Sequence, residues 1–246
     1  MTDYIADMIQ HAKEAMPNEA CGLLVQIGNK CVVHRARNIS MNPREGFAVA
    51  PEDYLAATER GKVLGIYHSH PYGLPVASMP DLAACEIANL PFHIVSVPVE
   101  GHAVFYPSGY KAPLIGRPFK HGVLDCYTVI KDWYAAHRVT IPDFEREEVW
   151  WEKGGNLYLE NFAAAGFSRT TDALQYGDVI LMQYRSPVPN HAAVFVGESK
   201  ILHHLTGRLS GVDVWGGYWE KFTTHIVRHK QWEILPERKP LHGLGY

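Results

Sequence analysis

Two kinds of hydrophobic spacing alternate along the first half of the chain. Apolar residues recur at helical spacing at Ile5, Met8, Ile9 and Ala12, and Pro17 marks the end of that segment. Shorter apolar runs bounded by glycine or proline follow, and they predict five strands and two further helices. The expected strands are 22–27, 30–35, 63–70, 93–97 and 102–106, and the expected helices are 51–60 and 78–89. This mixture predicts an α/β fold.

The second half has helices first and strands after them. The helical segments are 125–137 and 156–165, and Gly166 ends the second of them. The apolar runs that follow predict strands at 178–183, 191–196, 200–205 and 225–229. Because the two kinds of element are segregated, this half is expected to be α+β.

Tryptophan usage divides the chain in two. All six tryptophans lie after residue 130, and a stretch rich in proline and glycine, YPSGYKAPLIGRPFKH, separates the halves. Such a stretch resists both helix and strand. We therefore expect domains at 1–110 and 121–235, a linker at 111–120 and a mobile tail at 236–246.

Composition and charge narrow the class of protein. Hydrophobic residues make up 47% of the 246 residues, enough for a substantial core, and the net charge is −3. Without a basic run, a nucleic acid partner is not expected. No apolar stretch approaches the roughly 20 residues of a membrane helix, so no membrane insertion is expected. The N-terminal segment lacks a signal-like apolar block, and the four cysteines show no paired spacing, which indicates reduced thiols.

The densest candidate chemistry lies in the segment YHSHPYGLPVASMPD. His68 and His70 are two residues apart on an expected strand, so both side chains leave the same face. Two such imidazoles can share a metal ion, and Asp81 can add a third ligand from the start of the next helix. Three protein ligands leave one position open, which is typical of a catalytic Zn²⁺ site. Zinc lowers the pKa of bound water and polarises a carbonyl group.

Two further residues complete this candidate site. Glu19 can take a proton from water, and Ser78 can donate a hydrogen bond to a developing oxyanion. Structural alternatives exist for each of them. Ser78 and Asp81 have the S-x-x-D spacing of a helix capping box, and Glu19 alone is compatible with a solvated surface charge. An isolated H-x-H pair also occurs without a metal.

These residues together resemble the signature of the JAMM (MPN-type) zinc peptidases. The spacing H-x-H-x7-S-x2-D is complete here, and the glutamate is followed by Ala-Cys-Gly-Leu-Leu. The resemblance covers roughly the first 107 residues. It implies an MPN-type mixed α/β domain that hydrolyses peptide or isopeptide bonds, with Zn²⁺ as cofactor. In that family pattern His68, His70 and Asp81 are metal ligands, Glu19 is the general base and Ser78 the oxyanion helper.

A second candidate site in the other half is built on a thiol. Cys126 falls in the first turn of an expected helix, where the partial positive charge of the helix N-terminus favours the thiolate. His191 opens one expected strand and His203 lies on the next, so antiparallel pairing would bring the two rings together. One histidine can activate the thiol, and the other can fix the tautomer and orientation of the first histidine. Alternatively, Cys126 is a packed residue, and the histidine pair arises by chance among 14 histidines.

The order Cys126, His191, His203 resembles the NlpC-type cysteine peptidases. The dipeptide Asp-Cys, the segment YGDVILM and the segment HAAVFVGESKILHH carry the likeness. It implies a papain-like α+β fold and cleavage of peptidoglycan stem peptides at γ-D-glutamyl–diamino acid bonds. Two departures are visible: Tyr127 follows the cysteine where cell-wall hydrolases commonly have serine, and no upstream tyrosine aligns with the one that many members place near the oxyanion.

The pairing of these two domains resembles the tail assembly protein K family of long-tailed phages. The resemblance implies a protein made in the host cytoplasm that acts at the virion tail tip or in a tail assembly intermediate. Its partners would be other tail-tip proteins and peptidoglycan, with the thiol domain opening the cell wall during DNA entry and the zinc domain acting in tail assembly. We expect Trp215 and Trp219 to be the most exposed tryptophans, although core positions are commoner for this residue.

Two alternatives to a bifunctional peptidase remain. One is an assembly factor whose domains mainly bind tail proteins with little or no catalysis. The other is a cytosolic isopeptidase that uses only the zinc site. Complete residue sets at both sites favour the bifunctional peptidase over the first alternative, and the attached NlpC-type half argues against the second.

Overall fold

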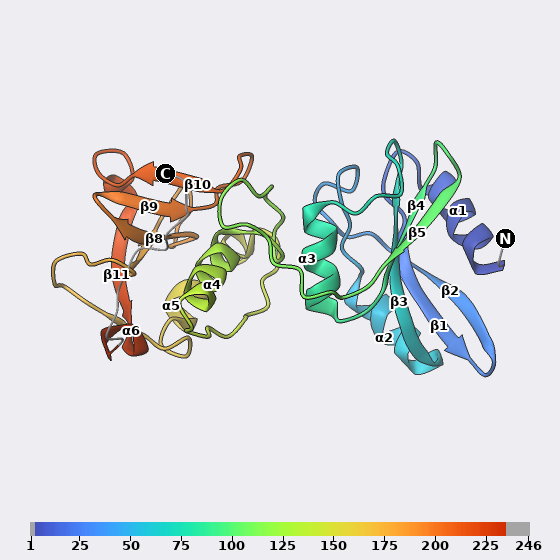
Figure 1. Cartoon of the computed structure of the whole chain (residues 1–246), viewed down its shortest axis with the longest axis horizontal. Helices are drawn as coiled ribbons and strands as arrows, with labels where there is room; N and C mark the ends of the chain where they lie inside the picture. The colour runs from blue at the N-terminus through green and yellow to red at the C-terminus, as the bar shows by residue number, and fades with distance from the viewer. Residues whose placement is uncertain (1–2, 235–246) are drawn as a thin grey trace. The chain divides into compact units, whose positions relative to one another are not determined.

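The computed structural model describes residues 3–234 (Figure 1). The predicted tail at 236–246 therefore lies outside the described residues. The chain forms two compact units, Met1–Lys111 and Ala112–Tyr246. Each unit has one sheet with its own helices, which confirms the predicted fold class of an α/β domain followed by an α+β domain.

The first unit is built on a five-stranded sheet with the order β2-β1-β3-β4-β5. Strands β3 and β4 are parallel, and the other pairs are antiparallel. The strands are β1 Cys21–Ile27, β2 Lys30–Ala36, β3 Lys62–His70, β4 Phe92–Ser96 and β5 Gly101–Phe105. All five strands and all three helices predicted for this half are present, with bounds that differ by at most a few residues.

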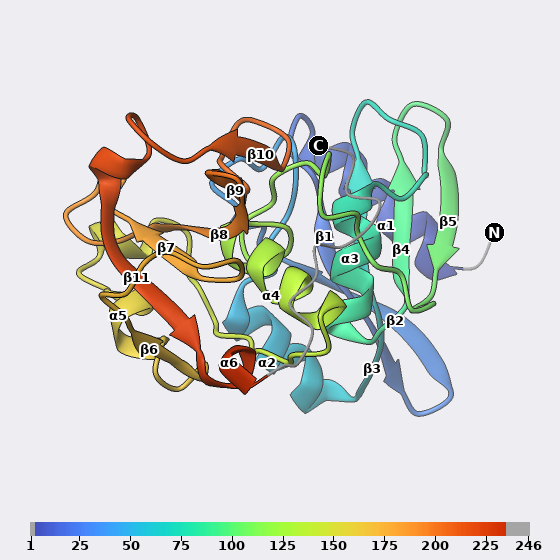
Figure 2. The same ribbon diagram turned by 60° about the vertical axis from the view of Figure 1, so that its left-hand side comes forward.

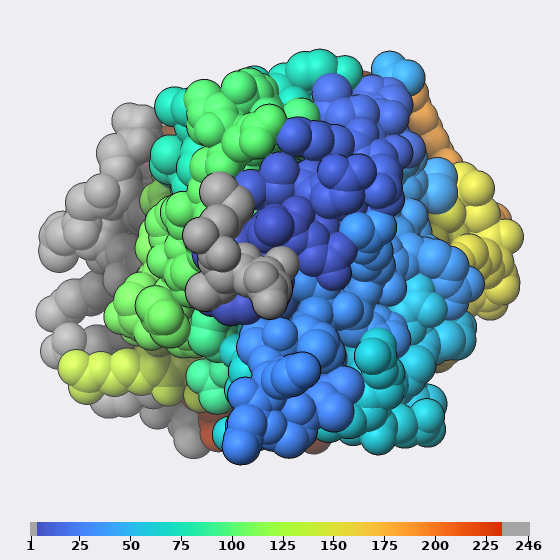
Figure 3. Space-filling view, turned by 90° about the vertical axis from the view of Figure 1, so that its right-hand side faces the viewer, coloured from blue at the N-terminus to red at the C-terminus, as the bar shows by residue number. Residues whose placement is uncertain are grey.

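Helices cover both faces of this sheet (Figure 1). Helix α1, Asp3–Ala15, buries Met8, Ile9 and Ala12 on one face, and Figure 3 shows it in dark blue on the surface of the unit. Helices α2, Pro51–Arg60, and α3, Met79–Ala88, pack on the other face. Both faces of the sheet are apolar, and each helix has one apolar face. Helices on both sides of the sheet therefore bury more apolar surface than helices on one side would.

The second unit has a six-stranded antiparallel sheet with the order β10-β9-β8-β7-β11-β6. The strands are β6 Phe167–Arg169, β7 Val179–Met182, β8 His191–Gly197, β9 Lys200–His203, β10 Gly211–Val214 and β11 Thr223–His229. Helix α4, Cys126–Ala136, packs on β8 and β9 (Figure 2). Its buried Trp133 and Tyr134 lie in an aromatic core with Trp232, so the helix that begins at Cys126 is held firmly to the sheet.

Several elements of the second unit differ from the prediction. The helix expected at 156–165 is α5, Leu157–Asn161. It ends early because backbone bonds from Gly166 to Ala163 and from Phe167 to Phe162 close the next residues into turns. Strands β6 and β10 and helix α6, Lys230–Ile234, were not predicted, since none of these short elements has a continuous apolar run like those of β7 and β8.

Among residues 3–234, no helix combines the length and apolar character needed to cross a membrane.

Candidate functional site

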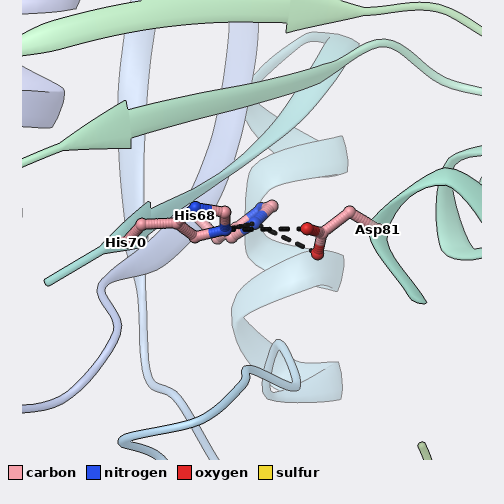
Figure 4. Close-up of side chains that lie close together, drawn as sticks. All are labelled: His68, His70 and Asp81. Carbon is pink, nitrogen blue, oxygen red and sulfur yellow. Dashed lines mark hydrogen bonds and ion pairs between the residues drawn. The ribbon is translucent and has the colours of Figure 1, made fainter. Parts of the chain in front are cut away.

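The three predicted metal ligands of the first unit lie together (Figure 4). His68 and His70 come from the end of β3, and Asp81 from the first turn of α3. The His68 Nε2 atom is 3.2 Å from Asp81 Oδ1 and 3.2 Å from His70 Nε2, and His70 Nε2 is 3.6 Å from Asp81 Oδ2. Strand alternation and the helix start therefore place three donor atoms around one point, as the sequence predicted.

The donor set fits a zinc ion. His70 Nδ1 donates to the Leu74 carbonyl at 2.8 Å, so Nε2 is the ring nitrogen that would lose its proton and bind a metal. With bonds of about 2.0–2.1 Å, two ligands of a tetrahedral zinc lie about 3.3 Å apart. The observed separations of 3.2 and 3.6 Å match that spacing. Two imidazoles and a carboxylate are also the ligand types that zinc prefers.

Electrostatics keep the carboxylate of this donor set ionised. Burial by itself would raise the pKa of Asp81, but hydrogen bonds with His68 and His70 hold the pKa of that carboxyl well below its usual range. The carboxylate is therefore ionised at neutral pH. Phe47 stacks on the His68 ring at 4.5 Å and restricts its orientation.

Ser78 and Asp81 form the capping box that the structural alternative predicted. Ser78 Oγ accepts from the Asp81 amide at 3.3 Å, and Asp81 Oδ2 accepts from the Ser78 amide at 2.8 Å. The Ser78 hydroxyl also donates to Asp81 Oδ2 at 2.7 Å. The cap orients the carboxylate whose Oδ1 faces His68, so capping and ligation involve the same pair of residues and do not exclude each other.

Glu19 is buried, only 9% exposed, rather than a surface charge. Its amide donates to the Pro43 carbonyl at 2.7 Å, and its carbonyl accepts from the Asn38 side chain at 3.0 Å. Ser69 lies between the two metal-site histidines in the sequence. Its Oγ accepts a hydrogen bond from the amide of Ala20, the residue after Glu19. Burial lowers the pKa of His70, but its bonds with Asp81 and with the Leu74 carbonyl raise it, and the negative charge of Glu19 adds to that increase.

In the second unit, Cys126 is the first residue of α4, as predicted. The Asp125 side chain caps the helix by accepting from the amides of Tyr127 and Thr128, and Arg146 donates to its other oxygen at 3.0 Å. The expected thiolate is not favoured by these surroundings. Burial, together with the negative charge of Asp125, raises the pKa of Cys126 to about 11.

Two groups lie against the sulfur of Cys126. A backbone hydrogen bond from Ala192, the residue after His191, lowers its pKa, so β8 begins beside the thiol. The Tyr158 hydroxyl lies 3.2 Å from Sγ. Sequence reasoning missed Tyr158, because it lies on the short helix α5 downstream of the cysteine and belongs to no local motif. Its contact with the thiol arises only from folding.

The predicted histidine pair is also brought together. His191 Nε2 lies 2.9 Å from His203 Nδ1, and both rings are buried. His203 Nε2 lies 3.0 Å from Asp213 Oδ2, a partner that the sequence did not indicate because strand β10 was not predicted. Trp219 packs on the His203 ring at 4.7 Å and is only 6% exposed, so the expectation that it is an exposed tryptophan is wrong. It lies in the core of the site, not in a surface groove.

The protonation of His191 predicts how activity should vary with pH. Burial, with the nearby histidines, lowers the pKa of His191 well below 6.5. A protonated ring cannot accept the thiol proton, so the rate falls only when the pH drops below that lowered pKa. If the second unit is a thiol peptidase with His191 as its base, the acid limb of its kcat/KM should lie below pH 6.5. An acid limb above pH 7 would contradict His191 as the base.

Comparison with known proteins assigns both units. Residues 1–107 match the prokaryotic homologs of the JAB domain, and residues 116–228 match the NlpC/P60 family. A JAB1/MPN domain protein from Archaeoglobus fulgidus is 20% identical and covers 44% of this chain and 87% of its own, with a TM-score of 0.30. A lipoprotein-like NLP/P60 protein from Staphylococcus aureus is 17% identical and covers 47% of this chain and 37% of its own, with a TM-score of 0.34. The chain is therefore a two-domain protein whose parts both come from peptidase families.

Two relatives extend over most of the chain. The tail tip assembly protein K of Escherichia phage N15 is 35% identical over 226 residues, which are 91% of this chain and 93% of that protein. The tail tip assembly protein K of Escherichia phage lambda is 38% identical over 185 residues, 75% of this chain and 90% of that protein. The chain belongs to the tail tip assembly protein K family.

Proposed function

We propose that the second unit is a thiol endopeptidase that cleaves stem peptides of peptidoglycan at γ-D-glutamyl–diamino acid bonds. The observation that carries the proposal is the placement of Cys126 at the start of α4, against the backbone that follows His191, with His191 paired to His203. A nucleophile, a base and a group that orients the base are the parts that thiol acyl transfer requires.

The chemistry follows from the hydrogen bonds of the site. His191 Nε2 is directed to His203, which leaves Nδ1 to accept the proton of Cys126. The sulfur attacks the scissile carbonyl carbon, His191 returns the proton to the leaving amine, and the C–N bond breaks. Water, deprotonated by His191, then hydrolyses the thioester and restores the thiol. Because the thiol is protonated at rest, proton transfer accompanies the attack.

The Tyr158 hydroxyl is proposed to stabilise the oxyanion of this reaction. It lies 3.2 Å from the sulfur, so it also lies close to the carbonyl that the sulfur attacks. We expect Tyr158→Phe to lower kcat about 10²-fold with little change in KM, because loss of one oxyanion donor acts on the transition state.

A matched control for Tyr158 is Tyr127→Phe. Tyr127 is a buried tyrosine next to Cys126, and its hydroxyl donates to the Pro142 carbonyl rather than to the thiol. Steady-state kinetics on a defined muropeptide should show the large loss only for Tyr158→Phe. Equal losses in the two variants would assign the Tyr158 effect to packing.

For the first unit we propose a zinc-dependent peptidase that acts in tail assembly. His68, His70 and Asp81 would hold the ion, and a zinc ion held there would supply Lewis acidity toward water and toward the substrate carbonyl. Glu19, which is buried, would accept the proton of the attacking water. Ser78 donates to the oxyanion after giving up its bond to Asp81.

Both proposals can be tested by mass spectrometry of muropeptides. Purified peptidoglycan is incubated with the full chain, with a thiol-site variant and with a zinc-site variant. We expect γ-D-glutamyl cleavage products from the full chain and from the zinc-site variant, and none from the thiol-site variant. Products that disappear only in the zinc-site variant would assign wall cleavage to the first unit and refute the proposal.

A second candidate function is an assembly factor that mainly binds tail proteins. One feature of the site favours it: Cys126 is placed next to the carboxylate of Asp125, and burial with this charge raises the pKa of the thiol, which disfavours the reactive thiolate. Under this function, wild-type protein and site variants would support tail assembly equally well, and peptidoglycan would stay intact. Either function fits a protein made in the host cytoplasm that joins other tail-tip proteins, in an assembly intermediate or in the virion tail tip.

A further inference from the structure

We infer that Asp213 is a positioning residue of the thiol site, which fixes the protons of both histidines so that His191 Nδ1 remains bare toward Cys126. The inference rests on the proposed thiol peptidase function and deepens it. Asp213 belongs to no motif in the sequence, and its role follows from the contacts that it makes across the sheet.

The three side chains follow a diagonal line over neighbouring antiparallel strands. Asp213 lies on β10, His203 on β9 and His191 on β8. His203 pairs with Gly211 on one side and with Ala193 on the other, so Asp213 and His191 are each displaced by two residues from a direct pair. Displacement by two keeps all three side chains on one face of the sheet, where long side chains reach each other.

The direction of the hydrogen bonds follows from Asp213. An ionised carboxylate can only accept, so His203 Nε2, at 3.0 Å from Oδ2, must carry the proton. In a neutral ring, Nδ1 of His203 is then an acceptor, and His191 Nε2, at 2.9 Å, must be the donor. Neutral His191 therefore has its proton on Nε2 and a lone pair on Nδ1. One acidic group thus determines the tautomers of two rings.

The carboxylate is fixed in this role by further donors. Arg208 donates to both of its oxygens at 2.9 Å, and Trp219 Nε1 donates to Oδ2 at 3.2 Å. Burial alone would raise the pKa of Asp213, but the bonds with Arg208 and His203 lower it to about 2. Asp213 is therefore an acceptor throughout the pH range in which a thiol peptidase works.

Loss of the carboxylate would release this constraint. Without an acceptor at Nε2, His203 can carry its proton on Nδ1 and donate it to His191 Nε2. His191 would then hold its own proton on Nδ1, at the atom that must receive the thiol proton. The chain would be folded, and the nucleophile present, but the base would be blocked in that fraction of molecules.

The test compares Asp213→Ala with Arg208→Ala. Both variants lose the Arg208–Asp213 ion pair, but only Asp213→Ala loses the acceptor for His203. We expect kcat for muropeptide hydrolysis to fall about 10²-fold in Asp213→Ala and only a few-fold in Arg208→Ala. Equal losses in the two variants would mean that Asp213 acts by anchoring its strand, and would overturn the inference.

A second readout does not depend on turnover. Nitrogen-15 NMR of the histidine rings in the substrate-free full chain reports which nitrogen carries the proton. The wild-type protein should have Nε2–H on His191 and on His203, and Asp213→Ala should gain the Nδ1–H form of His191. Wild-type rings with Nδ1–H, or unchanged rings in Asp213→Ala, would overturn the inference even if that variant does not turn over substrate.

The two readouts separate the inference from the proposed function. If the wild-type protein cleaves no peptidoglycan but its rings have the expected protons, the peptidase proposal fails and the positioning role of Asp213 stands. If the wild-type protein cleaves peptidoglycan and the rings have the opposite protons, the positioning role fails and the peptidase proposal stands.

Discussion

Cys126→Ala should reduce hydrolysis of purified peptidoglycan by about 10³-fold or more, because no other group in the site can form the acyl intermediate. The residue is the first of α4, and the Asp125 cap that starts the helix uses the side chain of Asp125 and the amides of the next residues. Removal of the sulfur therefore leaves the cap intact. The release of soluble muropeptides measures the loss.

Cys31→Ala is the matched control for this prediction. Cys31 is a half-buried free cysteine on β2 in the first unit, away from any group assigned to catalysis. It should keep wild-type activity, which excludes a general effect of removing a thiol. Unfolding curves of the two variants should be close to that of the wild type. Undiminished digestion by Cys126→Ala would refute the thiol mechanism.

His70→Ala is expected to remove the single zinc ion that each wild-type chain should bind. His70 Nε2 is one of three donor atoms gathered at the end of β3 and the start of α3. Loss of an outer-shell partner already costs about 10- to 100-fold in metal affinity, so loss of a direct ligand should cost more. Metal content after dialysis against a weak chelator, measured by mass spectrometry, checks the result.

Two further variants make the zinc prediction specific. His34→Ala removes a half-buried histidine of β2 in the same unit, and it should retain one zinc per chain. Glu19→Gln should also retain the ion but lose zinc-dependent peptidase activity, because Glu19 is proposed as a base rather than a ligand. Loss of zinc in Glu19→Gln would make Glu19 a ligand, and retention of zinc in His70→Ala would refute the ligand assignment.

The first unit was the easier half to predict. Its helices are 10 to 13 residues long and its strands are bounded by clear turn residues, so each period is long enough to recognise. The metal cluster also follows from local rules. Strand alternation places His68 and His70 on one face, and the capping spacing places Asp81 at the start of α3.

The second unit was predicted less completely, for identifiable reasons. Strand β10, with the sequence Gly-Val-Asp-Val, has no continuous apolar run, and the Asp213 contact was missed with it. Tyr158 reaches the thiol from a helix 32 residues along the chain. We predicted an ionised Cys126 because the helix N-terminus favours a thiolate. Burial of the thiol, which only the fold determines, instead raises its pKa.

The sequence by itself determined the fold class and the order of the main elements, because these depend on periodicity, and it named eight candidate site residues from short spacings and from resemblance to known families. The tertiary structure decided which distant groups surround them. Burial sets the ionisation of Cys126 and His191, and strand register sets the line from Asp213 through His203 to His191. Desolvation and cross-strand contact depend on residues far apart in the chain, so no local pattern specifies them.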